Sequence, residues 1–157
     1  MMQRKLKLYI ENSVISMYFQ EDDPYKRDLT RQFWRDVLPN FDVYISEMVI
    51  REMEGIEDYN LRTATVKLVK NFTVLEESPE VIRLSNIYLT RKRMPMGDAI
   101  HLVFASLWGM DVFVTWNRKH LFKASTQEML AEVNVHFKLP IPTILTPEIF
   151  FEFEEEV

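Results

Sequence analysis

The sequence predicts an α/β fold in which a mainly parallel sheet of four or five strands is flanked by helices. Three observations indicate this class. Short runs of β-branched, aliphatic and aromatic residues alternate with longer segments whose apolar residues recur every three or four positions. The run at 112–114 is apolar throughout, as in a strand that is covered on both faces. No segment rich in Gly, Ser or Pro divides the 157 residues, so we expect one core.

The first part of the chain is expected to contain a strand, a short helix and a longer helix. Residues 6–10 form the strand, and the alternation of lysines and Tyr9 with aliphatic residues predicts one partly exposed face. A short apolar segment at 14–19 follows a turn. Pro24 then opens the longer helix and Pro39 ends it, because proline fits the first turn of a helix and disrupts its interior.

The middle of the chain repeats this alternation. A strand at 43–45 leads into Ser46, which is a favourable N-cap residue for the next helix. Pro79 lies where the first turn of another helix is expected. The remaining elements of this part, in order, are a helix at 60–70, a strand at 73–75 and a helix at 80–91.

The most apolar helix is expected between Asp98 and Gly109, and its composition predicts that it is buried. Gly109 suits the position just after the C-terminus of that helix. Met94 and Met96, in the loop before it, are expected to fill gaps in the core. The elements that follow are a strand at 111–115, a turn at 117–122, a helix at 126–135 and a strand at 143–145.

The composition excludes several classes of site. The chain has no cysteine, which rules out disulfides, thiolate nucleophiles and cysteine-bound metals. Its three glycines are isolated, so no glycine-rich phosphate loop is present. Its three histidines do not form an H-E-x-x-H motif, so we do not expect a histidine-built zinc site. No apolar run is long enough to span a bilayer, and we expect a soluble, cytoplasmic protein without a membrane partner.

The formal net charge of −5 does not exclude a nucleic-acid partner. Four glutamates lie in 151–157, which we expect to be an acidic tail after a single domain at 1–150, and that domain alone carries −1. Basic residues within the domain are clustered. The clusters are Arg91-Lys92-Arg93, Arg118-Lys119-His120, and Lys26, Arg27, Arg31 and Arg35 at helical spacing.

Four polar residues are expected to meet at the carboxyl edge of the sheet, where open α/β sheets bind their ligands. Glu11 directly follows the first strand, and Glu52 lies on the helix after the second strand. Asp98 opens the apolar helix, and Asn117 follows the fourth strand by two residues. Asp111 begins that strand, so we expect it at the opposite edge.

Three carboxylates in one place repel one another unless a cation offsets their charge. Mg²⁺ or Mn²⁺ suits such oxygen ligands, and either ion can activate water for attack on a phosphodiester. Glu11, Glu52 and Asp98 are therefore candidate metal ligands in a nuclease of RNA or DNA.

Most of these residues also have an ordinary structural explanation, but Glu11, a carboxylate between two apolar segments, is expected near the core and needs a partner. Asp98 can simply favour a helix N-terminus, and Glu52 can be a solvated helical residue. Ser13 can cap the short helix, Asn117 can make a turn, and His101 on an apolar helix can be a hydrogen-bonded core residue.

Four segments in order resemble the motifs of PIN-domain proteins. The match runs from Lys7 to about Glu148, and its segments are 9–15, 45–52, 97–105 and 112–121. The resemblance implies a Rossmann-like parallel sheet and a homodimer. It also implies Mg²⁺- or Mn²⁺-dependent endoribonuclease activity, as in VapC-type toxins, which are paired with a small antitoxin protein.

The resemblance assigns catalytic roles to Glu11, Glu52, Asp98 and Asn117, of which the three carboxylates would hold the metal. Ser13 and Thr115 would be supporting hydroxyls. Two of the residues depart from the family pattern, because aspartate is usual at the positions of Glu11 and Asn117. An alternative is therefore a degenerate PIN module that binds RNA or protein without cleavage.

Overall fold

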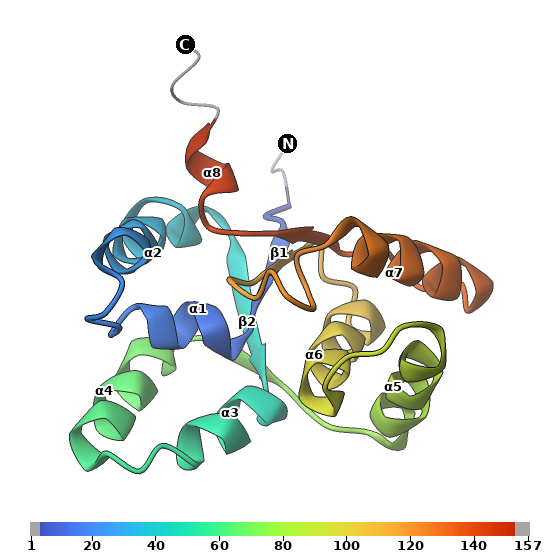
Figure 1. Ribbon diagram of the computed structural model, residues 1–157, viewed down its shortest axis with the longest axis horizontal. Helices are drawn as coiled ribbons and strands as arrows, with labels where there is room; N and C mark the ends of the chain where they lie inside the picture. The colour runs from blue at the N-terminus through green and yellow to red at the C-terminus, as the bar shows by residue number, and fades with distance from the viewer. Residues whose placement is uncertain (1–3, 153–157) are drawn as a thin grey trace.

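A computed structural model describes residues 4–152, and it contains one five-stranded sheet in which every pairing is parallel (Figure 1). The strand order is β3-β2-β1-β4-β5. This confirms the predicted α/β class. The strands are β1 (Lys7–Ile10), β2 (Asp42–Ser46), β3 (Thr73–Leu75), β4 (Val112–Val114) and β5 (Thr143–Leu145).

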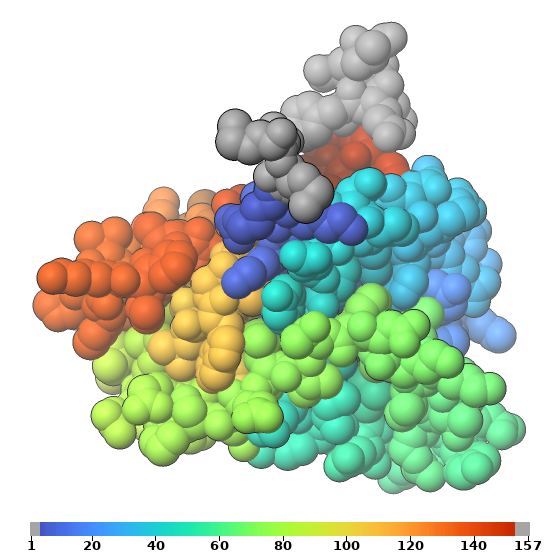
Figure 2. All heavy atoms as spheres, turned by 180° about the vertical axis from the view of Figure 1, so that it is seen from behind, coloured from blue at the N-terminus to red at the C-terminus, as the bar shows by residue number. Residues whose placement is uncertain are grey.

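Helices cover both faces of the sheet. In Figure 1, α1 to α4 lie on one side and α5 to α7 on the other, and Figure 2 shows α7 and α5 at one end of the molecule with α2 and α4 at the other. The α-helices are α1 (Asn12–Met17), α2 (Pro24–Asp36), α3 (Glu47–Glu54), α4 (Tyr59–Val69), α5 (Pro79–Arg91), α6 (Met96–Leu107), α7 (Ala124–His136) and α8 (Ile149–Glu152), and a short 3-10 helix, η1, spans Leu38–Asn40.

The strand order places a topological switch between β1 and β4. The chain runs from β1 outward through β2 to β3, and then returns to β4 on the other side of β1 before it reaches β5. Successive connections therefore leave β1 and β4 in opposite directions, and open α/β sheets bind their ligands at the carboxyl ends of the strands beside such a switch. Ile10 and Val114, the last residues of the two strands, are partners in the register.

The core lies on both faces of the central strands. In α6, every side chain from Ala99 to Ser106 is buried, as the apolar composition predicted. The predicted exposed face of β1 is wrong for Tyr9, whose exposed fraction is 0%. Because β1 is the middle strand and helices cover both faces of the sheet, Tyr9 is buried, whereas Lys7 at the start of the strand is only partly buried. Met94 is buried as predicted, but Met96 is 38% exposed at the start of α6 and fills no gap.

Two residues that were predicted at helix ends, Ser46 and Gly109, lie there in the structure. Ser46 caps α3 by accepting a hydrogen bond from the Val49 N–H group. Gly109 follows α6 with a φ of 68°, in the left-handed region that glycine adopts without strain. The N-cap of α1 is Glu11 instead of Ser13, because the Glu11 carboxylate accepts the bond from the Ser13 N–H group. No helix within 4–152 is both long and apolar enough to cross a membrane.

The predicted boundary between domain and tail falls inside α8. This helix spans Ile149–Glu152 and therefore extends past residue 150. Its Phe150 ring packs 5.2 Å from the Phe33 ring of α2. The remainder of the predicted acidic tail, 153–157, lies outside the described residues.

Candidate active site

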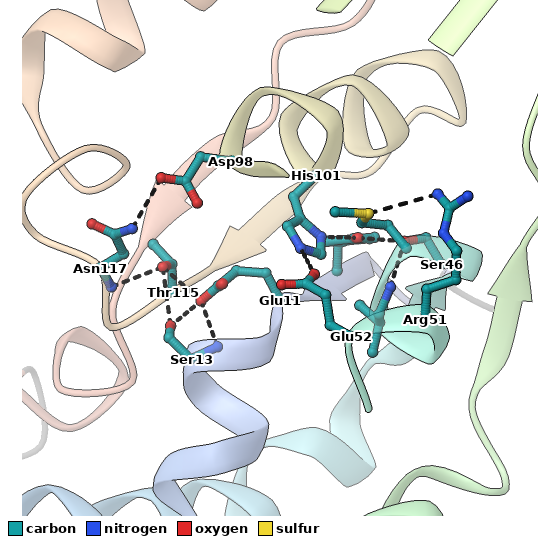
Figure 3. Close-up of polar contacts among 12 residues, drawn as sticks. Glu11, Ser13, Ser46, Arg51, Glu52, Asp98, His101, Thr115 and Asn117 are labelled. Carbon is teal, nitrogen blue, oxygen red and sulfur yellow. Dashed lines mark hydrogen bonds and ion pairs between the residues drawn. The ribbon is translucent and has the colours of Figure 1, made fainter. Parts of the chain in front are cut away.

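The predicted polar residues meet at the carboxyl edge of the sheet, at the switch between β1 and β4 (Figure 3). Glu11 and Thr115 directly follow β1 and β4. Asp98 lies in the first turn of α6, and Glu52 lies on α3. Asp111 lies at the opposite edge, as predicted, where its carboxylate accepts a 2.8 Å hydrogen bond from the Lys7 N–H group.

Glu11 is a buried carboxylate that is held by hydroxyl and amide donors. Its Oε1 atom accepts from the Thr115 hydroxyl at 2.8 Å and from the Ser13 N–H group at 3.1 Å, and it contacts the Ser13 hydroxyl. The residue is only 5% exposed. Burial raises the pKa of Glu11 to about 7, although the charge of His101 and the bonds from Thr115 and Ser13 oppose the rise.

The two hydroxyl residues that were predicted to support the site join β1 to β4. Ser13 Oγ accepts a 2.8 Å bond from the Trp116 N–H group and lies 3.3 Å from Thr115 Oγ1. Thr115 Oγ1 in turn accepts from the Asn117 N–H group at 2.9 Å. Both hydroxyls therefore fix the position of the Glu11 carboxylate relative to the loop after β4.

Asn117 presents its amino group to Asp98. The Oδ1 atom of Asn117 accepts a 2.9 Å bond from the His120 N–H group, so its Nδ2 atom is the one directed at Asp98 Oδ2, at 3.2 Å. Asn117 therefore both stabilises the turn after β4, through the His120 N–H group, and contacts the site residue Asp98. Burial raises the pKa of Asp98, and nearby Glu52 adds to the rise, while His101, His120 and the Asn117 bond oppose it.

Glu52 is bound by a histidine. Its Oε1 atom lies 2.5 Å from His101 Nε2, and its side chain is 39% exposed while that of His101 is 2% exposed. Burial acts to raise the pKa of Glu52, but the hydrogen bond and charge of His101, together with Arg51, outweigh it and lower the pKa. His101 is the buried, hydrogen-bonded histidine that the sequence predicted, and it also reaches into the site.

Sequence reasoning missed this link between His101 and the acidic residues. A signal was present, because His101 follows Asp98 by three positions and residues at that spacing share a helix face. Nothing in the local sequence indicated that Glu52, 49 residues away, would be its partner.

The donor chemistry of the site suits a hard divalent cation, but the three carboxylates do not converge on one point. Within residues 4–152, no group of three or more Asp, Glu or His side chains lies close enough together to hold a metal ion. Glu11 and Asp98 lie at the same edge of the sheet (Figure 3), and the charge of Asp98 adds to the rise in the pKa of Glu11. Two carboxylates suffice for Mg²⁺, because this ion keeps several waters and binds substrate phosphate. The three-ligand set remains a prediction.

Basic and aromatic groups border the carboxylates. Lys26 of α2 places its Nζ atom 5.4 Å from the centre of the Trp116 ring. Arg118 and Lys119 follow Asn117 and are exposed, and Arg118 pairs with Glu148 at 3.3 Å. Arg118 and Lys119, from one predicted basic cluster, therefore directly follow Asn117, and Lys26, from another, lies over the Trp116 ring.

Two cavities differ in their relation to this site. A cavity of about 290 Å³ reaches Glu52 between α1, α3 and α4 and is bordered by Asn12, Ile15, Phe19 and Met53. A larger cavity, about 570 Å³, lies at the amino-terminal ends of β2 and β3, away from the carboxylates. The smaller cavity adjoins Glu52 alone among the predicted site residues, so we assign the site by the chemistry of its side chains and not by cavity size.

No family model and no curated protein sequence matches this chain. Several solved structures are similar to it. One is VapC20 of Mycobacterium tuberculosis, described as a sarcin-ricin loop cleaving toxin. It is 13% identical to this chain with a TM-score of 0.59, and the match covers 71% of this chain and 91% of the VapC20 chain. A toxin-antitoxin complex from Klebsiella pneumoniae is 21% identical with a TM-score of 0.60, over 90% and 97% of the two chains. VapBC-1 from nontypeable Haemophilus influenzae is 12% identical with a TM-score of 0.60, over 91% and 99%. These likenesses confirm the predicted PIN-type fold.

Proposed function

We propose that this protein is a metal-dependent endoribonuclease that hydrolyses phosphodiester bonds of RNA. The observation that carries the proposal is the meeting of Glu11 and Asp98 at the switch between β1 and β4, with Glu52 nearby. The charge of His101 does not offset the burial of Glu11, whose pKa is raised to about 7, and a divalent cation would supply further positive charge.

In this proposal, Glu11 and Asp98 hold Mg²⁺ or Mn²⁺, and Glu52 contributes its charge from α3. The bound ion would activate water and offset charge on the phosphodiester. The chain positions these carboxylates in advance. Ser13 and Thr115 hold Glu11, and the Asn117 amino group holds Asp98. Because its oxygen already accepts from the His120 N–H group, Asn117 orients Asp98 instead of acting as an oxygen ligand.

The groups around the carboxylates support RNA as the substrate. Arg118 and Lys119 carry positive charge next to Asn117, and Lys26 lies over Trp116 of the same loop, so these groups would reduce the repulsion between the carboxylates and phosphate. Nucleic-acid backbones are bound through such Lys and Arg contacts. We therefore place the RNA backbone across the β4–α7 loop and the start of α2.

Cleavage of structured and single-stranded RNA by purified protein with Mg²⁺ or Mn²⁺ tests the proposal. Asp98→Asn should slow cleavage by about 100-fold or more, which is the scale for loss of one electrostatic contact at a reacting centre. Asp42→Asn is the matched control, because Asp42 is exposed at the start of β2, at the opposite edge of the sheet. Equal cleavage by Asp98→Asn and wild type would refute the assignment.

A second candidate is a PIN module that binds RNA or protein without cleaving. Two observations favour it. The Glu52 carboxylate is hydrogen-bonded to His101, and Asn117 presents an amino group where a metal ion would need an oxygen ligand. Calorimetric titration with Mn²⁺ separates the two. Binding that Asp98→Asn removes supports the nuclease, whereas no binding at millimolar Mn²⁺ supports the module.

We further propose a small antitoxin as protein partner, with a basic side chain directed at the acidic crevice. The support is the fold shared with a toxin-antitoxin complex from Klebsiella pneumoniae. An adjacent reading frame whose product co-purifies with this chain would confirm the partner, and the absence of such a frame would contradict it. The resemblance also predicts a homodimer, which light scattering of the purified protein tests.

A further inference from the structure

A chain of buried hydrogen bonds ends at Glu52. The Ser46 hydroxyl lies 2.8 Å from the Tyr9 hydroxyl, which lies 2.7 Å from His101 Nδ1. His101 Nε2 then lies 2.5 Å from Glu52 Oε1 (Figure 3). Ser46 and Tyr9 have exposed fractions of 0%, and His101 of 2%. This series of hydrogen bonds thus connects β2, β1 and α6 to a carboxylate at the surface of α3.

The direction of each bond follows from the groups at the two ends. An ionised Glu52 only accepts, so His101 Nε2 carries the hydrogen and, in the neutral ring, Nδ1 accepts. With the ring neutral, the Tyr9 hydroxyl donates to Nδ1 and its oxygen accepts from Ser46; with the ring charged, Nδ1–H donates to the Tyr9 oxygen and the Tyr9 hydroxyl donates to Ser46 Oγ. Ser46 Oγ accepts in turn from the Val49 N–H group at 3.4 Å. In either state, both ring nitrogens of His101 and both buried hydroxyls have a hydrogen-bond partner.

A glutamate at the surface has three side-chain torsions and adopts several conformations unless a partner restrains it. His101 is such a partner, and it is itself fixed by Tyr9, whose ring stacks on that of Phe113 at 5.3 Å. The orientation of Glu52 is consequently determined by the core of the protein, although Glu52 itself is partly exposed.

We propose that His101 is a positioning residue that directs the Glu52 carboxylate toward the cation held at the site. This inference rests on the proposed metal-dependent function. It assigns His101 no contact with RNA or with the ion. Hydrogen-bond partners of metal-site carboxylates affect metal affinity in this indirect way.

Two substitutions of similar chemistry separate positioning from packing. His101→Asn keeps a polar group near the Nδ1 position, so it can still accept from Tyr9, but it is too short to reach Glu52. His101→Gln is one methylene longer and can donate to Glu52. Circular dichroism and thermal unfolding establish that both variants are folded. If His101→Asn does not fold, Tyr9→Phe, which removes only the hydroxyl that orients the ring, takes its place.

Calorimetric titration with Mn²⁺ in the absence of RNA is the decisive measurement. We expect His101→Asn to weaken Mn²⁺ binding by roughly 10- to 100-fold, and His101→Gln to restore it. In a Glu52→Gln background, His101→Asn should cause no further loss, because His101 acts only through Glu52.

The outcomes distinguish this inference from the proposed function. Wild-type protein that binds no Mn²⁺ overturns both. If wild type binds Mn²⁺ and His101→Asn binds it with the same affinity, the positioning role alone is overturned. It is also overturned if His101→Asn lowers Mn²⁺ affinity equally in the Glu52→Gln background. The positioning role is supported if His101→Asn lowers Mn²⁺ affinity, His101→Gln restores it, and His101→Asn causes no further loss in the Glu52→Gln background.

Discussion

Replacement of Glu11 by glutamine should stabilise the metal-free protein at alkaline pH. The Glu11 carboxylate is buried, and its partners are two hydroxyls and one backbone N–H group instead of a paired cation. A glutamine at this position can accept the same bonds through its oxygen without carrying the charge. The substitution therefore removes the cost of a buried charge while it keeps the local contacts.

The size of the effect follows from the pKa of Glu11, which burial raises from 4.5 to about 7. Each pKa unit corresponds to 1.36 kcal/mol, so ionised Glu11 costs the folded state about 3 kcal/mol. Below pH 4.5 the carboxyl is protonated in both the folded and the unfolded protein, and the cost is absent. Above about pH 7 it is ionised in both states, and the whole cost applies. The contribution of Glu11 to stability thus falls as the pH rises through this interval.

Urea unfolding in EDTA, at pH 4.5 and at pH 8, measures this dependence. The free energy of unfolding of Glu11→Gln should exceed that of wild type by about 3 kcal/mol at pH 8 and by about 0.5 kcal/mol or less at pH 4.5. Glu54→Gln, an exposed change on α3, is the matched control and should show no such dependence. Equal differences at the two pH values, or a less stable Glu11→Gln at pH 8, would refute the reasoning.

Three further substitutions test other parts of the molecule. Asn117→Asp places a second carboxylate beside Asp98, so Mn²⁺ affinity should rise while stability in EDTA falls; a calorimetric titration that shows unchanged affinity would contradict this. Tyr88→Phe removes the 2.6 Å donor of the buried Asn134 Oδ1 atom and should lower the free energy of unfolding in urea by about 1–3 kcal/mol. Lys119→Ala should weaken RNA binding for all sequences alike and reduce the slope of log affinity against log salt by about 1; an unchanged slope would exclude Lys119 from the interface.

The placement of the site could be predicted because it depends on local patterns and one general rule. Apolar periodicity indicated where strands end, and strands that run parallel end at one edge of the sheet. Glu11, Asp98 and Asn117 therefore had to lie together, and Asp111 apart from them, once the sheet was parallel. The structure agrees on all four.

The detailed contacts of the site could not be predicted in the same way. Asn117 was a candidate both for a turn and for the site, and only the His120 N–H group decides which end of its amide faces Asp98. The burial of Tyr9 depends on β1 being the middle strand, which alternation along one segment does not indicate. Met96 was expected to fill a gap, but it begins α6 at the surface.

The sequence by itself determined the α/β class, the positions of the strands and most helix ends, and which carboxylates share an edge of the sheet. These properties depend on residues close together in the chain, through periodicity, proline positions and capping side chains. Only the tertiary structure decided that Tyr9, His101 and Glu52 form one hydrogen-bonded chain. Tyr9 and His101 are 92 positions apart in the sequence, and His101 and Glu52 are 49 positions apart. The order of the strands brings the members of each pair within hydrogen-bond distance. Hydrogen bonds act only over about 3 Å, so such contacts depend on the packing of the whole fold.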